Sequence, residues 1–319
     1  MGPVTMSTPV PLHLSDVQTR PRIFTVWERY RHSSAHWLVE CFAEFLGVFF
    51  YVYPAILQVG LGYAGGIVFA LGICSSTSGG HFNPAVTITF VILKGFPPLK
   101  AVRYIIAQIL GSYVACLLIY AQWHDIIKES EVALDSVGML ESTLFTPNGP
   151  AGAFGLYILP GLNLGRVFLN EFVTDTFLAI VIWGTLDPTN ILIPPQSAIW
   201  VIAVAYGAAV WGFSVPALAA NPARDVGGRL AALTIYGKSA AGNNYSSIAA
   251  LTSIPATLFG ALVYQVFLAD YARVIPSAQR EFMDVHHQHA QKSEIMKSSS
   301  ESSSSKDKAE IMHNEDVAV

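Results

Sequence analysis

Long apolar stretches recur along this chain, and they limit its possible folds more than any other feature. A helix needs about 20 apolar residues to cross a hydrocarbon layer about 30 Å thick. Six stretches reach or approach that length, at residues 38–59, 63–79, 99–121, 167–186, 197–213 and 247–269. The chain is 52% hydrophobic and only 13% charged, with a mean hydropathy of +0.46. We therefore predict an all-α membrane protein with six transmembrane helices.

Two further apolar segments, at 84–93 and 222–233, are only about half as long as a span. Each begins at a proline, which is favoured at the first position of a helix. The prolines belong to two identical tripeptides, Asn83-Pro84-Ala85 and Asn221-Pro222-Ala223. A segment of this length cannot cross the bilayer, but it is tolerated there if it lines a water-filled cavity. We predict that both are re-entrant half-helices.

The order of these parts is the same in both halves of the chain. Each half has a span with a carboxylate, Glu44 or Glu171, then a second span, an Asn-Pro-Ala half-helix and a closing span. The halves cover about 37–121 and 167–271. Because three spans are an odd number, the second half must enter the membrane from the opposite side. The sequence therefore predicts an inverted repeat, an arrangement found in transport proteins.

The charged residues predict the topology. Lysine and arginine gather before the first span, between the second and third, and after the sixth, which places these segments in the cytoplasm. We expect a mostly disordered cytoplasmic arm (1–36), a membrane domain (37–271) and a disordered, serine-rich cytoplasmic tail (272–319). The loop that joins the repeats (122–166) is acidic and is expected outside, with a surface helix at 123–136. The expected location is the plasma membrane.

Composition also argues against several classes of function. A net charge of −4, without a basic patch, gives no case for nucleic-acid binding. The three cysteines, Cys41, Cys74 and Cys116, show neither metal nor disulfide spacing. The predicted spans contain no Ser/His/Asp set, metal-ligand helix or paired catalytic carboxylates. We therefore expect no metal, no cofactor and no enzymatic activity.

A single Asn-Pro-Ala tripeptide would indicate little, because an asparagine before a helix-starting proline is an ordinary N-cap. Two copies at matching places in two repeats are more specific. Around them, over residues 36–270, the chain resembles the aquaporin family, also called major intrinsic proteins. Beyond the two tripeptides, the resemblance is carried by Ala43-Glu44-Phe45-Leu46-Gly47, Gly79-Gly80-His81-Phe82, Gln108 and Glu171.

The resemblance implies six spans and two half-helices that meet at mid-membrane, a pore through every protomer, and a homotetramer. It also implies that Glu44 and Glu171 hold the non-helical loops so that loop carbonyls line the pore. From the residues alone, an inter-helix hydrogen bond or a proton relay is the alternative for these carboxylates. His81 and Gln108 are expected to support the pore or its loops.

The expected pore has a physical basis in the two half-helices. Each N-terminus concentrates roughly half a positive charge at the membrane centre, and the amides of Asn83 and Asn221 offer hydrogen-bond donors to a passing oxygen. A cation would meet positive potential where it has lost its hydration. Arg224 adds a full charge, although a surface arginine that reaches the headgroups is the alternative. We predict a passive channel for water and small uncharged solutes that excludes protons and ions.

Three features favour glycerol among the solutes. The fifth span lacks the histidine that is characteristic of water-selective members, and Gly207 or Ala209 takes its place. Tyr63 at the second-span position gives an aromatic wall opposite Arg224, although a tyrosine at the membrane interface is the alternative. Asp225 completes the Asn-Pro-Ala-Arg-Asp form of the glycerol-conducting branch. One departure is a loop before the second tripeptide that is about two residues longer than expected, which leaves Leu218 where that branch carries an aromatic residue.

Two other functions remain open at this point. One is a water-selective aquaporin. The other is a secondary transporter of a small polar solute, which would also show inverted repeats and broken helices but would normally need an ion-binding cluster at the midplane. Asp175 lies four residues after Glu171, on the same helix face, and the pattern gives no role for it.

Overall fold

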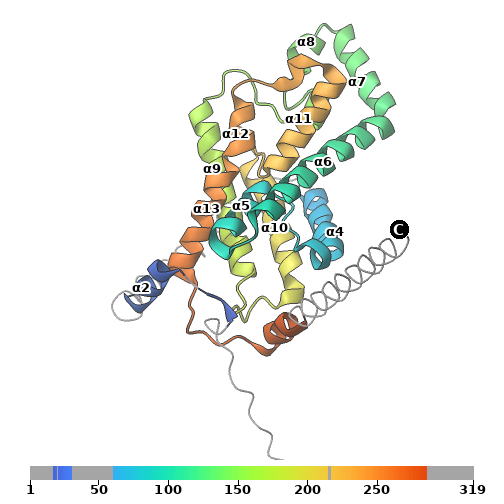
Figure 1. Cartoon of the computed structure of the whole chain (residues 1–319). Coiled ribbons are helices and arrows are strands. Elements are labelled where there is room, and N and C mark those ends of the chain that lie inside the picture. The colour runs from blue at the N-terminus through green and yellow to red at the C-terminus, as the bar shows by residue number, and fades with distance from the viewer. Residues whose placement is uncertain (1–16, 20, 31–59, 215–216, 286–319) are drawn as a thin grey trace, which may run out of the picture. The chain divides into compact units, whose positions relative to one another are not determined.

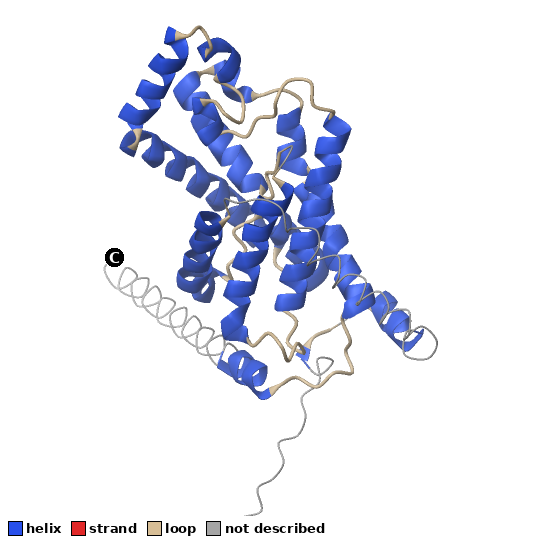
Figure 2. Ribbon diagram, turned by 180° about the vertical axis from the view of Figure 1, so that it is seen from behind, coloured by secondary structure: helices blue, strands red, loops and turns tan. Residues whose placement is uncertain are grey.

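The computed structural model describes residues 17–19, 21–30, 60–214 and 217–285. The first predicted span (38–59), with Cys41 and Glu44, lies outside these residues, as do most of the predicted arm and tail. All regular elements in the described part are helical (Figures 1 and 2). The chain divides into two compact units, and the larger one comprises Arg20–Asp187 and Ser197–Asp270.

Five of the six predicted spans fall within described residues, and each is helical. The helices are α4 (Leu61–Ser78), α6 (Pro98–Gln122), α9 (Leu164–Thr185), α10 (Pro195–Phe213) and the consecutive segments α12 (Tyr245–Leu251), α13 (Ser253–Val263) and η4 (Tyr264–Leu268). Four of these are long and apolar enough to cross a membrane: α6, α9, α10 and Tyr245–Leu268. The helix α4 is 18 residues long and apolar. Hydropathy thus placed the described spans correctly, with ends that differ by a few residues.

The last span is interrupted near its start. A turn at Thr252 separates α12 from α13. Pro255 explains the break, because it has no N–H to donate to the carbonyl four residues earlier, that of Leu251. At the other end the helix widens into the π-helical segment η4, which closes with a bond of 2.9 Å from the Ala269 N–H to the Tyr264 carbonyl.

Both predicted half-helices are present and start at their prolines. They are α5 (Pro84–Lys94), of 11 residues, and α11 (Pro222–Tyr236), of 15 residues. Gly95 ends α5 with φ of +70°, a conformation that glycine adopts without strain. Both helices are shorter than the roughly 20 residues of a complete crossing.

The remaining elements of the larger unit are short helices. They are α2 (Arg22–Tyr30), α7 (His124–Ser136), α8 (Leu140–Thr143), η2 (Pro150–Ala153) and η3 (Lys238–Ala241). The predicted surface helix of the joining loop corresponds to α7. Glu131 connects α7 to α11, because its carboxylate accepts from the Tyr236 hydroxyl of α11 at 3.2 Å. The same carboxylate accepts from Lys128 of α7 at 2.6 Å.

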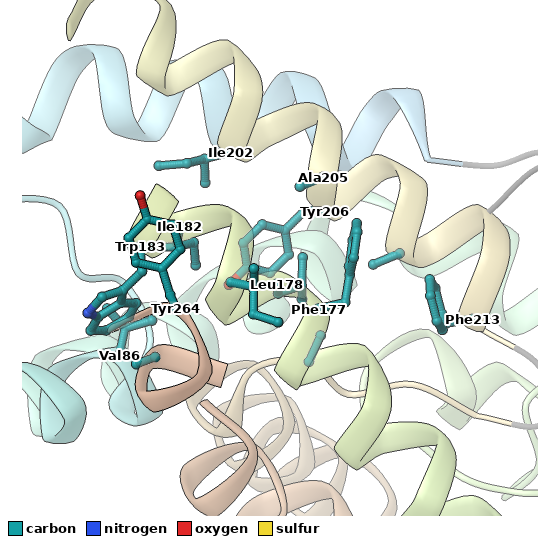
Figure 3. Packing of buried hydrophobic residues seen from close by; sticks show 14 of the residues in the cluster. Val86, Phe177, Leu178, Ile182, Trp183, Ile202, Ala205, Tyr206, Phe213 and Tyr264 are labelled. Atoms are coloured by element: carbon teal, nitrogen blue, oxygen red, sulfur yellow. The ribbon is translucent and has the colours of Figure 1, made fainter. Parts of the chain in front are cut away.

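The main buried cluster joins side chains of α9 and α10 with others from α5, α13 and η4, and α9 packs most closely against α13. Figure 3 shows Ile202, Tyr206 and Phe213 of α10 directed toward Phe177 and Leu178 of α9. In contrast, α6 exposes a row of large apolar side chains along its length: Leu99, Val102, Ile106, Leu110, Val114 and Leu118. An apolar surface of this kind is expected for a helix whose solvent is lipid.

The described residues of the smaller unit include Pro188–Gln196 and residues 271–285. Within it, the Gln279 side chain is almost completely buried and donates from Nε2 to the carbonyls of Asn190 at 2.7 Å and Ile193 at 3.3 Å. These two bonds fasten the helix at 277–285 to the loop between α9 and α10.

Candidate functional site

The N-termini of the two half-helices meet, and their capping asparagines join them. Asn83 Oδ1 accepts from the Ala85 N–H at 2.9 Å, and Asn221 Oδ1 accepts from the Ala223 N–H at the same distance. Each side-chain amide donates to the opposite loop. Asn83 Nδ2 donates to the Ala220 carbonyl at 3.0 Å, and Asn221 Nδ2 donates to the Phe82 carbonyl at 2.9 Å. The two repeats are therefore tied together reciprocally at the start of each half-helix.

The two carbonyls that accept these bonds belong to residues in an unusual backbone conformation. Phe82 has φ of +48° and Ala220 has φ of +54°, and they are the only non-glycine residues with positive φ in the described part of the chain. This conformation costs a non-glycine residue about 1–2 kcal/mol. Each of them directly precedes a capping asparagine, so the strain occurs at equivalent positions in both repeats.

Two neighbouring side chains of α9 hold the loop before Asn221. Glu171 is completely buried, and its carboxylate accepts from the Ala219 N–H at 2.9 and 3.0 Å and from the Ala220 N–H at 2.6 Å. Asn170 Nδ2 donates to the carbonyls of Phe213 at 2.7 Å and Ala217 at 3.0 Å. The carbonyl of Ala220 is thereby left to face Asn83.

In the first repeat, Thr87 connects His81 and Gln108 to Asn83. The Thr87 hydroxyl donates to the Asn83 carbonyl at 3.0 Å and accepts from Gln108 Nε2 at 3.1 Å. His81 Nδ1 lies 3.3 Å from the same hydroxyl. The His81 ring packs among the rings of Phe90, Phe96 and Tyr104. Both predicted support residues thus reach the first motif through one threonine.

Arg224 lies in the first turn of α11. Its Nη1 donates to the Phe154 carbonyl at 2.9 Å, and its own carbonyl accepts from the Ser112 hydroxyl at 3.2 Å. Tyr63 and Leu218, two of the residues predicted to surround it, both pack against the main core. The Tyr63 ring stacks on Tyr206 of α10, with centroids 6.0 Å apart.

Gly207 lies at a close approach between α10 and the start of α4. A Cβ atom placed on Gly207 would lie 3.3 Å from both the Ala64 Cβ and the Gly60 carbonyl oxygen. A Cβ on Gly60 would lie 2.3 Å from the Gly207 carbonyl oxygen, which is impossible without movement. Backbone packing therefore requires glycine at position 60, whereas a side chain at position 207 would force its neighbours to move by a few tenths of an ångström.

A buried ion pair supports the loop that receives Arg224. Arg229 Nη2 lies 2.7 Å from Asp225 Oδ1, and the same nitrogen donates to the Leu156 carbonyl at 2.8 Å. The Arg229 guanidinium also lies 5.5 Å from the centre of the Tyr157 ring. Burial raises the pKa of the Tyr157 phenol, against a smaller opposing effect of Arg229. The neutral hydroxyl donates to the Ala240 carbonyl at 2.9 Å.

Asp175 is paired within the membrane domain. Its side chain is 2% exposed, and Oδ2 accepts from the Ser253 hydroxyl at 2.6 Å. The pair links α9 to the first residue of α13. Among the residues that the structure describes, no three His, Cys, Asp or Glu side chains gather in a way that could hold a metal ion.

The arrangement is that of a membrane protein with two helix N-termini meeting inside it, and comparison with known proteins gives its family. The model of a family described as "Major intrinsic protein" matches residues 31–264. The chain belongs to the major intrinsic protein family. Members of this family are channels, so this major intrinsic protein is a membrane channel and not an enzyme. The predicted family and fold are confirmed.

Individual relatives of this major intrinsic protein agree with that assignment. Aquaporin-3 of Laccaria bicolor is 53% identical over 313 residues, which cover 90% of this chain and 94% of the relative. Aquaglyceroporin-2 of Rhizophagus irregularis is 33% identical over 214 residues, which cover 60% of this chain and 64% of that protein. The X-ray structure of the aquaglyceroporin from Plasmodium falciparum matches with a TM-score of 0.54 at 21% identity. That match covers 67% of this chain and 85% of the other, and it shows the fold.

Several residues at the site of this major intrinsic protein were missed by the sequence analysis. Two of them, Asn170 and Tyr206, directly precede the predicted residues Glu171 and Gly207. Asn170 could have been found, because a polar side chain within an apolar span indicates a structural or functional role. Arg229 follows Asp225 by one helical turn, which is the spacing of an ion pair. Phe154 contributes only its carbonyl, and no feature of its side chain could have indicated that.

Proposed function

We propose that this protein is a passive channel for water and small uncharged solutes, glycerol among them, and that it excludes protons and ions. The proposed path passes between Asn83 and Asn221. The observation that carries the proposal is the meeting of two half-helix N-termini, each capped by an asparagine that donates to the carbonyl before the other. Both helices are too short to cross the bilayer. Because their N-termini meet, they place backbone N–H groups and two asparagine side chains together at one depth of the membrane.

The charge of these termini supports selectivity for neutral solutes. Each N-terminus carries roughly half a positive charge, so α5 and α11 concentrate positive potential at one depth. Arg224 adds a full charge two residues after Pro222. A neutral oxygen can accept hydrogen bonds there, whereas a cation is repelled where little water surrounds it.

Glycerol is supported by the side chains proposed for the narrowest part. We assign Arg224, Tyr63, Gly207 and Leu218 to this filter, with Gly207 contributing its backbone, because the space beside its Cα is taken by Gly60 and Ala64. Arg224 has five guanidinium donors, and Nη1 is engaged with Phe154, which leaves donors for hydroxyl groups of a polyol. Tyr63 provides an aromatic surface for its carbon backbone. The names of relatives include both aquaporins and an aquaglyceroporin, and a water-selective channel is the alternative.

The internal repeat extends these roles to residues that the structure does not describe. Glu171 accepts two loop N–H groups before Asn221, and we assign the equivalent role before Asn83 to Glu44. We further propose a homotetramer in the plasma membrane with both termini cytoplasmic. The exposed apolar row on α6 supports burial of that helix in lipid or against another subunit. The proposed channel domain is 37–271, between an arm (1–36) and a tail (272–319).

The test is stopped-flow light scattering on proteoliposomes that contain the full chain. We expect rapid fluxes of water and of glycerol that need no ion gradient and show no counterflow, because a channel does not couple solute to an ion. Arg224→Val is expected to raise the cation leak, since it removes a positive charge from the path.

Arg166→Val is the matched control, because Arg166 is an exposed residue in the first turn of α9. It should leave the cation leak at the wild-type level. Water flux without glycerol flux would support the assignment as a channel but contradict the proposal that glycerol passes through it. Uptake that depends on an ion gradient would instead support a transporter.

A further inference from the structure

We infer that Tyr206 is a specificity-determining residue of the path, whose hydroxyl replaces the Asn83 amide as the donor that a solute meets on that side. The inference rests on the proposed channel function and adds a residue to it. Tyr206 belongs to α10, and Figure 3 shows its ring reaching toward α9 beside Phe177 and Leu178. The side chain is 8% exposed, so it borders at most a narrow opening.

The amide hydrogens of the two asparagines have different hydrogen-bond partners. An asparagine amide has two N–H donors. In Asn83, one is directed to the Ala220 carbonyl at 3.0 Å, and Tyr206 Oη lies 3.4 Å from the same nitrogen. In Asn221, one is directed to the Phe82 carbonyl, and the residues that the structure describes provide no second acceptor. The two asparagines, equivalent by the repeat, are therefore not equivalent as donors.

The Tyr206 hydroxyl accepts a hydrogen bond from Asn83. A phenol oxygen that accepts from Asn83 still has its own O–H to donate. Asn83 itself is 4% exposed, whereas Asn221 is partly exposed. A solute oxygen thus meets the Asn221 amide from one repeat and the Tyr206 hydroxyl from the other.

The Tyr206 ring has an aromatic neighbour in Tyr63. The rings of Tyr63 and Tyr206 are stacked, with centroids 6.0 Å apart and planes inclined by 24°. Tyr206 therefore connects the residue proposed for the filter, Tyr63, to the first motif asparagine. Two adjoining aromatic rings give a continuous apolar surface for the carbon chain of a polyol. They also limit the width of the path, because an aromatic pair is stabilised by its mutual contact beyond the area that it buries.

The experiment compares Tyr206→Phe and Tyr206→Ala with the wild-type full chain in proteoliposomes. The probes are water, glycerol and the four-carbon polyol erythritol, and each permeability is normalised to the folded protein incorporated. Tyr206→Phe keeps the ring and removes the donor, so glycerol permeability should fall about fivefold, the factor that one neutral hydrogen bond contributes. Tyr206→Ala removes part of the wall, so erythritol permeability should rise.

The control is Tyr113→Phe, which removes a tyrosine hydroxyl bonded to Thr234 at 3.1 Å between α6 and α11. It should match the wild type for all three probes. The inference is overturned if both Tyr206 variants also match the wild type for all three. If Tyr206→Ala does not fold, Tyr206→Phe alone decides, because it keeps the packing of the ring.

The outcome is separable from that of the proposed function. If the wild type passes water but not glycerol, the glycerol assignment is wrong. Tyr206 is then tested by a lower water permeability in Tyr206→Phe and by a gain of glycerol flux in Tyr206→Ala. Absence of both changes would reject the role of Tyr206 while leaving the channel in place.

Discussion

Arg229 Nη2 lies 2.7 Å from Asp225 Oδ1, one turn away on α11, and both side chains are almost completely buried. The same guanidinium donates to the carbonyls of Leu156 and Ala241. Arg224, from the same helix, donates to the carbonyl of Phe154. The segment that follows η2 is thus held against α11 at two points. Arg224, a residue of the proposed filter, bonds Phe154, and Arg229, just over one helical turn further along, bonds Leu156.

We predict that breaking this ion pair will destabilise the protein and disturb the filter. Removing one partner of a buried pair typically costs about 3–5 kcal/mol, because the other charge remains buried without compensation. Asp225→Asn and Arg229→Met should each lower the thermal unfolding temperature of the purified protein. Each should also change the ratio of glycerol to water permeability, since the carbonyl that positions Arg224 is less firmly held.

A double-mutant cycle separates this coupling from general damage. Asp225→Asn combined with Arg229→Met leaves no unpaired charge, so its loss of stability should be smaller than the sum of the two single losses. Strictly additive losses would show that the two side chains do not stabilise each other.

We predict that Glu171→Gln will impair the loop before Asn221. The Ala219 N–H lies 3.0 Å from Oε1 and 2.9 Å from Oε2, and the Ala220 N–H donates to Oε1 at 2.6 Å. A glutamine places an NH2 donor at one of these two oxygen positions, where it faces the Ala219 N–H and weakens the bond of that group. Leaving a buried N–H unsatisfied costs about 1–3 kcal/mol. The stability of the protein should fall by that amount, and water flux per folded channel should fall with it, because the Ala220 carbonyl loses its fixed direction.

Glu129→Gln is the matched control for this change. Glu129 is exposed on α7, and its substitution is chemically identical. Unfolding temperature and water flux should both remain at wild-type values in this variant. Equal behaviour of the two variants would exclude the supporting role of Glu171.

The fold was largely predictable because its main determinants are local in the sequence. Hydropathy placed the spans, and Asn83-Pro84 and Asn221-Pro222 placed the half-helices at their observed starts. An apolar length or a capping asparagine acts on its own neighbourhood. The site was less predictable because it depends on interactions between distant segments. The bond from Asn83 to the Ala220 carbonyl joins residues of different repeats and involves no side chain of Ala220.

Asp175 and Gly207 are two examples of residues whose contacts with distant segments could not be predicted from the sequence. Asp175 had no assigned role, and its partner, Ser253, lies in a helix 78 residues further along. Hydroxyl groups are common in apolar spans, so no pattern would have selected that serine. Gly207 was expected to leave space for a solute, and its backbone packs against Gly60. Sequence shows that a residue is small, but only the structure shows what occupies the space beside it.

The positive φ of Ala220 leads to a prediction about backbone strain. At a position with φ of +54°, glycine avoids the roughly 1–2 kcal/mol that a Cβ atom costs there. Against this, glycine loses more conformational entropy on folding, about 0.5–1 kcal/mol, and the buried methyl group is lost. These effects nearly cancel, so Ala220→Gly should change the free energy of unfolding little.

Ala219 provides the comparison, because it is equally buried and its φ is not positive. Ala219→Gly loses the methyl group and the entropy without relieving any strain. It should therefore be less stable than Ala220→Gly by about 1–2 kcal/mol, measured by thermal or denaturant unfolding in the same detergent. Equal losses for the two variants would show that Ala220 is not strained, and the carbonyl direction that Asn83 requires would then need another cause.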